Sequence, residues 1–147
     1  MSTVLSNGTL LTALVATGAA QILKVMLVIV TERRLALGRF LETGGMPSSH
    51  TAAVTALATS LGLRFGWGSP QFAIAAVFGG IVMYDATGIR RAAGVQAELI
   101  NDLVQELAHL FDEGFQPQAL KTLLGHTYPQ VLVGALVGIT TALLVAL

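Results

Sequence analysis

The sequence contains no cysteine among its 147 residues. Disulfide bonds, thiolate metal sites and cysteine nucleophiles are therefore excluded together, whereas the redox compartment stays open. Charged side chains are also scarce, at 11% of the residues, while an average soluble domain carries about a quarter. The formal net charge is zero, which argues against a nucleic-acid partner because phosphates require a basic excess.

Apolar residues make up most of the chain instead. The chain is 54% hydrophobic, contains 16 glycines and has a mean hydropathy of +0.74. A bilayer core of about 30 Å requires roughly 20 apolar residues per helix, and four segments approach that length. They are Leu10 to Val30, Thr51 to Phe65, Phe72 to Tyr84 and Val131 to Leu147. We therefore expect residues 1–147 to form a single membrane domain, an all-α polytopic bundle of about four transmembrane helices surrounded by lipid bilayer.

Small residues in these segments predict tight helix packing. The last span contains Gly134 and Gly138, a small-xxx-small spacing that lets helices approach closely. A homodimer or a larger membrane complex is compatible with this composition. Between the third and fourth spans, apolar residues recur at helical spacing from Ile89 to Phe111 with polar residues on the opposite face. This pattern predicts an amphipathic helix, which we expect to pack across the mouth of the bundle.

Orientation follows from the basic residues of the loops, because cytoplasmic loops carry the excess of Lys and Arg. Most of these residues lie in the loops after the first and the third span, namely Arg33, Arg34, Arg39, Arg90, Arg91 and Lys121. These two loops are predicted to be cytoplasmic, which places both chain termini on the outer side. The polar motifs of the chain then converge at the cytoplasmic face.

The most polar of these motifs is GGMPSSH, at residues 44–50. A Pro-Ser-Ser sequence before a helix supplies an N-cap, and the free N–H groups with the helix dipole favour an anion. Taken alone, each signal has a plainer explanation. Ser48 or Ser49 can be only a cap, Arg90 and Arg91 can be topological anchors, and Lys24 can reach the interface from inside its span. Together these hydroxyl, imidazole and cationic side chains are the residue types that a phosphoryl-transfer site on one membrane face requires.

The same residues resemble a known family. Three ordered motifs carry the resemblance, at residues 44–58 (GGMPSSHTAAVTALA), 84–101 (YDATGIRRAAGVQAELIN) and 124–127 (LGHT), over most of the chain from Lys24 to Ile139. They are similar to the divergent family related to phosphatidic acid phosphatase and vanadium-dependent haloperoxidase. In that superfamily a Lys and two Arg hold phosphate, a Pro-Ser-Gly-His motif supplies a ligand and the general acid, and a later His is the nucleophile.

Carried over residue by residue, the resemblance implies two catalytic histidines, His126 as the nucleophile and His50 as the acid. Ser49 stands where the superfamily has Gly. The phosphate-binding residues that we expect from the resemblance and the loop chemistry are Lys24, Ser48, Ser49, Arg90, Arg91 and Lys121. No metal and no cofactor are expected.

Two positions depart from the superfamily pattern. Leu120 stands six residues before His126, where an Arg is expected, and Gln130 stands where the orienting carboxylate is expected. A neutral amide accepts a hydrogen bond from imidazole but does not offset the imidazolium charge. We therefore consider Gln130 and Asp85 as orienting residues, with Glu42 as another source of the missing charge. Arg90 and Arg91 are the candidates to replace the missing Arg.

The resemblance implies hydrolysis of a lipid or isoprenoid phosphomonoester at the cytoplasmic membrane face through a phosphohistidine. A second reading is a catalytically inactive scaffold or accessory subunit that retains an oxyanion-binding site. A transporter component is a third reading, which explains the intramembrane Lys24 but has no inverted repeat to support it.

Overall fold

The computed structural model describes residues 4–33, 44–110 and 118–146. These residues form five α-helices and two short 3-10 helices, without a strand among them, which confirms the all-α prediction. The α-helices are α1 (Gly8–Glu32), α2 (Ser49–Phe65), α3 (Pro70–Thr87), α4 (Ile89–Glu106) and α5 (Tyr128–Ala146). The 3-10 helices are η1 (Val4–Ser6) and η3 (Ala108–Leu110).

Three of the helices begin at side-chain caps that the local sequence supplies. The side chains of Asn7, Ser48 and Ser69 accept hydrogen bonds from backbone N–H groups three residues further along, at 3.1–3.3 Å. Each cap satisfies one of the N–H groups that a helix start leaves without an intrahelical partner. Pro70 follows its cap at the first helical position, where the missing N–H costs nothing.

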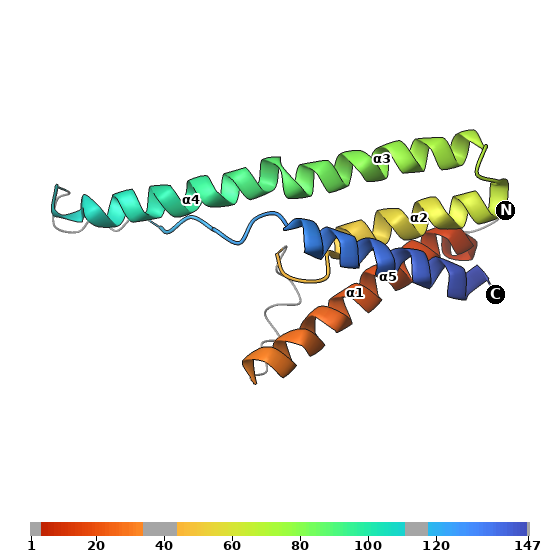
Figure 1. Ribbon diagram of the computed structural model, residues 1–147, viewed down its shortest axis with the longest axis horizontal. Helices are drawn as coiled ribbons and strands as arrows, with labels where there is room; N and C mark the ends of the chain where they lie inside the picture. The colour runs from red at the N-terminus through yellow and green to blue at the C-terminus, as the bar shows by residue number, and fades with distance from the viewer. Residues whose placement is uncertain (1–3, 34–43, 111–117, 147) are drawn as a thin grey trace.

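Helices α1, α2, α3 and α5 form the bundle, and α2 lies at its centre in contact with the other three (Figure 1). Small residues make the core because they allow close helix approach; they are Ala16, Ala20, Ala52, Ala56 and Ala142. Gly134 and Gly138 of α5 lie against backbone atoms of Ser48 and Ala52. The small-xxx-small spacing of α5 thus serves a contact inside the chain, so it is not available as a dimer face.

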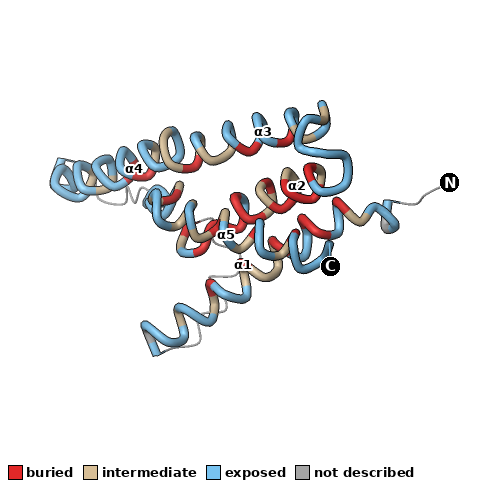
Figure 2. The backbone as a smooth tube through the Cα atoms, turned by 45° about the vertical axis from the view of Figure 1, so that its right-hand side comes forward, coloured by how far each residue is buried: buried red, intermediate tan, exposed pale blue. Residues whose placement is uncertain are grey.

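The bundle turns its large apolar side chains outward, as Figure 2 shows by the exposed outer faces of α1, α3 and α5. Among the residues that the structure describes, three helical stretches are long and apolar enough to cross a membrane: Gly8–Thr31, Pro70–Glu106 and Tyr128–Ala146. With these spans the chain is an integral, multi-pass membrane protein. The predicted second span corresponds to α2, whose 17 residues are fewer than in any of the three. Helix α3 covers the predicted third span from Phe72 to Tyr84 and extends a few residues beyond it at both ends.

The amphipathic helix of the sequence prediction exists, but its predicted position was wrong. Helix α4 does not pack across the mouth of the bundle; it continues α3 as one rod that leaves the bundle (Figure 1). Gly88 alone separates the two helices, and its N–H still bonds to the carbonyl of Tyr84. Within the described ranges, α4 contacts none of α1, α2 and α5. The helix begins at Ile89 as predicted but ends at Glu106, before the predicted end at Phe111, which lies outside the described residues.

The chain returns from α4 to the bundle along the segment of residues 118–124. Asn101 binds the backbone of Leu120 twice, through Nδ2 to the carbonyl at 2.9 Å and through Oδ1 from the N–H at 2.8 Å. Gly94 gives the segment room, because a Cβ there would lie 2.6 Å from the carbonyl of Thr122. The segment then reaches the end of the bundle where α2 and α5 begin and α3 ends. The start of α1 and the end of α5 lie at the opposite end of the bundle (Figure 1).

Candidate functional site

The loop before α2 is fixed by the close approach of α5. The N–H of Ser48 donates to the carbonyl of Gln130 at 3.1 Å, and Gly134 leaves space for the Ser48 carbonyl, which a Cβ would approach to 2.5 Å. The Ser48 hydroxyl is fully buried and accepts hydrogen bonds from the N–H and the hydroxyl of Thr51. Ser49 is buried as well. Ser48 is therefore occupied as a helix cap, and phosphate binding by Ser48 and Ser49 stays a prediction.

Backbone contacts of His126 and of the preceding Gly125 fix the position of His126. Its N–H donates to the carbonyl of Ala86 at 2.8 Å, which ties the loop before α5 to the end of α3. Gly125 has a φ of 76°, and a Cβ there would lie 2.4 Å from the backbone nitrogen of Arg91. Only glycine fits this position without strain. The Gly-His dipeptide thus delivers a buried imidazole, 4% exposed, to the junction of α2, α3 and α5.

The contact with Gln130 fixes the tautomer of His126. The Gln130 Oε1 accepts a hydrogen bond from the N–H of Thr127 at 3.1 Å, so this atom faces a donor and must be the amide oxygen. The same oxygen lies 3.2 Å from Nδ1 of His126. Nδ1 must therefore carry the proton, and Nε2 of the neutral ring keeps its lone pair. Nε2 is buried and has no hydrogen-bond partner in the described part of the chain.

Burial lowers the pKa of His126 below its usual value of 6.5, because it disfavours the charged imidazolium. The hydrogen bond with Gln130 and the backbone of Gly45 oppose this shift, whereas the charges of Lys24 and His50 reinforce it. The neutral form with a free Nε2 is therefore the favoured state of His126 at neutral pH.

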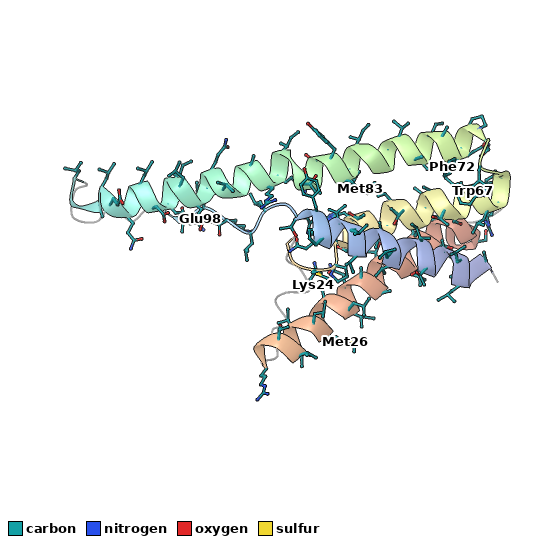
Figure 3. All side chains as sticks on the ribbon, viewed as in Figure 1. Lys24, Met26, Trp67, Phe72, Met83 and Glu98 are labelled. Carbon is teal, nitrogen blue, oxygen red and sulfur yellow. The ribbon has the colours of Figure 1, made fainter. Side chains whose placement is uncertain are left out.

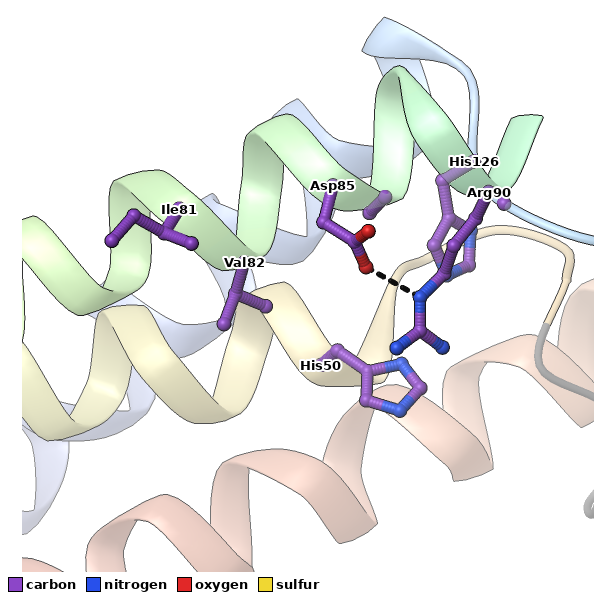
Figure 4. A pocket seen from close by; sticks show the side chains of 8 residues that line it. His50, Ile81, Val82, Asp85, Arg90 and His126 are labelled. Atoms are coloured by element: carbon purple, nitrogen blue, oxygen red, sulfur yellow. Dashed lines mark hydrogen bonds and ion pairs between the residues drawn. The ribbon is translucent and has the colours of Figure 1, made fainter. Parts of the chain in front are cut away.

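The two predicted catalytic histidines line one pocket of about 260 Å³ (Figure 4). Their ring centroids are 6.4 Å apart. Arg90 also lines this pocket, where its Nε donates to the Oδ2 of Asp85 at 2.5 Å. Apolar residues of α3, among them Ile81 and Val82, complete the wall. Two imidazoles and a guanidinium thus share one cavity, a set of groups that can bind and transfer a phosphoryl group.

Lys24 reaches the same end of the bundle from α1, as Figure 3 shows. Its side chain is only 2% exposed, and Gly45 lies so close that a Cβ there would be 3.6 Å from the Lys24 stem. Its charge acts on both histidines. Lys24 is therefore buried near both histidines, although it does not line the pocket, whereas its position in the sequence also allowed a side chain that reaches the membrane surface.

The structure does not bring every expected residue to the pocket. Arg91 and Lys121 are exposed and are not among its lining residues, and Asp85 pairs with Arg90 instead of with an imidazole. Glu42 lies outside the described residues. No group of three metal-binding side chains forms in the described ranges, so the absence of a metal stays a prediction.

Sequence reasoning also missed three contributors to the site. The Ala86 carbonyl and the apolar wall of Ile81 and Val82 have no signature in the sequence, because any apolar helix could supply them. Gly125 did have a signal, since a glycine directly before a candidate catalytic histidine suggests a backbone conformation that other residues avoid.

Comparison with known proteins places these residues in a family context. The sequence model of the family described as "Divergent PAP2 family" matches residues 5–141. The "Uncharacterized membrane protein YuiD" of Bacillus subtilis (strain 168) is 44% identical over 151 aligned residues, which cover 97% of this chain and 96% of that protein. No solved structure matches this chain.

Proposed function

Because the chain belongs to the divergent PAP2 family, we propose that it hydrolyses a lipid or isoprenoid phosphomonoester through a phosphohistidine at His126. The observation that carries this proposal is the state of His126. Gln130 leaves the ring with an unprotonated Nε2, and the ring lines a pocket that also holds an imidazole and a guanidinium. A neutral imidazole whose other nitrogen is oriented by an acceptor is the form of histidine that acts as a nucleophile.

The chemistry divides between the two histidines. Nε2 of His126 attacks phosphorus, the bond from phosphorus to the ester oxygen breaks, and His50 gives its proton to the leaving alkoxide. Water then attacks the phosphohistidine while His50 takes a proton back, which releases phosphate and restores both rings. Arg90 and Lys24 stabilise the charge on the phosphoryl oxygens. The dianionic substrate itself favours protonated His50, because an opposite charge nearby stabilises the imidazolium.

The apolar part of the pocket supports an amphiphilic substrate. Ile81 and Val82 belong to α3, and Ile81 is 61% exposed on the outer face of the bundle. A phosphate held by Arg90 would have its hydrocarbon beside these side chains and directed toward the bilayer. The head group would then stay at the membrane surface.

We place this site at the cytoplasmic face, with α2 as a fourth crossing between α1 and α3 and with both termini outside. The loop-charge asymmetry supports this orientation. Because the chain has no cysteine, a single cysteine at Gly45 can be compared directly with one at Ser69. In intact cells an impermeant thiol reagent should label the cysteine at position 69 and not the cysteine at position 45. Reversed labelling would refute the orientation.

A catalytically inactive scaffold that retains an oxyanion-binding site is the second candidate, and two observations favour it. Gln130 cannot neutralise an imidazolium, and the Asp85 carboxylate already occupies Arg90. The carboxylate bonds to Nε, so a substrate phosphate would bind the Nη groups of a guanidinium whose charge Asp85 already offsets. In the scaffold reading, phosphate binds without turnover.

The two candidate functions can be distinguished by measuring the inorganic phosphate that purified protein in detergent releases from its substrate. The wild type and His126→Ala are compared on lipid and isoprenoid phosphates. His109→Ala is the matched control, because His109 lies in η3, beyond α4 from the bundle. We expect turnover by the wild type and the control, and its loss in His126→Ala. Equal phosphate release by all three proteins would indicate a contaminating phosphatase and would refute the assignment.

Oxyanion binding is measured independently of turnover. Phosphate or vanadate should raise the thermal stability of the wild type, by about 2.7 kcal/mol at a hundredfold excess over the dissociation constant. Arg90→Ala should reduce this shift, whereas Lys121→Ala should not, since Lys121 does not line the pocket. A stability shift without turnover would favour the scaffold, and the absence of both would refute both candidates.

A further inference from the structure

The outer face of α4 is apolar and uncovered. Ile89 is 65% exposed, Ile100 47% and Leu103 46%. Figure 2 shows most of this helix as exposed. The segment of residues 118–124 covers a different side of the helix, at Gly94 and Asn101. Exposed apolar faces of this kind mark interaction sites. The question is which surface covers this one.

The lipid bilayer cannot cover it. The rod of Pro70–Glu106 contains 37 residues and is about 55 Å long, whereas the hydrocarbon core is about 30 Å thick. Even a tilt of about 40° leaves the rod longer than the core. Asp85 lies in the last turn of α3, and the other charged residues of the rod all lie in α4, so the excess length is α4. Because α4 continues α3 away from the bundle, its face stands off the membrane surface instead of lying along it (Figure 1).

The spacing of the apolar residues identifies the partner as another helix. Side chains separated alternately by four and three residues form a seam along α4 and its C-cap; they are Ile89, Ala93, Gln96, Ile100, Leu103 and Leu107. An average spacing of 3.5 residues is the heptad pattern of a coiled coil. Gln96 is the one polar member of the seam.

We propose that the seam of α4 is the contact with a second copy of this chain, in a parallel two-helix coiled coil outside the hydrocarbon core. Copies inserted in one membrane share their orientation, so a two-fold axis along the membrane normal brings identical seams together. Glu98 and Asp102 lie on the side of α4 away from the seam, where they remain in solvent. These carboxylates also disfavour an anionic lipid surface as the alternative occupant.

The absence of cysteine makes the test direct. Leu103→Cys lies on the seam, and Asp102→Cys, its neighbour in the sequence, lies off it. A disulfide requires Cα atoms within about 7 Å, so only the seam position satisfies this condition in the proposed dimer. Mild oxidation of native membranes should cross-link Leu103→Cys into a dimer and leave Asp102→Cys as a monomer. Equal cross-linking of both variants, or of neither, would overturn the proposal.

A second measurement uses the protein without an engineered cysteine. Light scattering in detergent should give the mass of a dimer for the wild type and of a monomer for Leu103→Glu. Leu103 is 46% exposed, so the substitution should leave the thermal unfolding of the monomer unchanged. A monomeric wild type would overturn the proposal. So would quenching of a fluorophore at position 103 by a quencher carried on lipid, because the bilayer would then cover this face.

Discussion

Among the glycines that the structure describes in helices, Gly138 lies nearest to the backbone of a neighbouring helix, so replacing it should be costly. A Cβ at position 138 would lie 2.3 Å from the carbonyl oxygen of Ala52 and 2.1 Å from the hydroxyl of Thr55. The Thr55 side chain can rotate away, whereas the Ala52 carbonyl belongs to the backbone of α2. Gly138→Ala therefore forces α2 and α5 apart.

The size of the effect follows from this distance. An ordinary contact begins at 3.4 Å, so the helices must separate locally by about 1 Å, an overpacking that costs about 1–3 kcal/mol. The gain in helix propensity from glycine to alanine is smaller, about 1 kcal/mol, and does not reverse the sign. The same displacement would weaken the bond from Ser48 to Gln130, and with it the placement of His50 and His126.

The matched control is Gly80→Ala in α3, where no atom lies within 4 Å of the added Cβ. Unfolding in detergent can be followed by the fluorescence of Trp67, the single tryptophan of the chain. We expect a lower midpoint for Gly138→Ala, with an unchanged or higher midpoint for Gly80→Ala. If Gly138→Ala is as stable as the control, the account of the bundle as held by close backbone contact between α2 and α5 is wrong.

Three further predictions concern the candidate site and the segment of residues 118–124. Because the pKa of His126 is lowered below 6.5, the unfolded chain binds more protons than the folded chain in acid. The free energy of unfolding should therefore fall as pH drops from about 7 to about 5, and His126→Gln should flatten this dependence. Gln130→Glu keeps an oxygen acceptor for the N–H of Thr127 and adds a charge beside the imidazole, so phosphate release should rise. An increase that persists in the double variant with His126→Ala would contradict the assigned role. Asn101→Ala removes both bonds to Leu120 and should speed hydrogen exchange of the Leu120 amide, while exchange in α2 stays unchanged as the internal control.

The sequence by itself determined the membrane character and most of the helices. Hydropathy over about 20 residues reports transfer into lipid, which depends on composition and not on which helix is the neighbour. The predicted first and last spans accordingly agree with α1 and α5 within a few residues. The motifs also indicated which polar residues share one end of the bundle, because alternating helix directions bring every second loop to the same side.

The tertiary structure decided how these elements meet. The spacing of Gly134 and Gly138 is the same whether the partner is another chain or the loop and helix of residues 48–55, and only the packed structure shows the second. The direction of α4 depends on the backbone dihedral angles of Gly88, the residue between α3 and α4. These angles decide whether α4 continues α3 or folds across the bundle. No periodicity of apolar residues contains those angles.

The candidate site shows the same division at the level of single atoms. His126 and Gln130 are four residues apart in the sequence, which suffices to predict that their side chains are in contact. It could not specify the tautomer, because this depends on the N–H of Thr127 pointing at the same oxygen. Nor could it predict that Asp85 binds Arg90 instead of an imidazole, since all of these groups line one pocket and the folded backbone decides which of them meet.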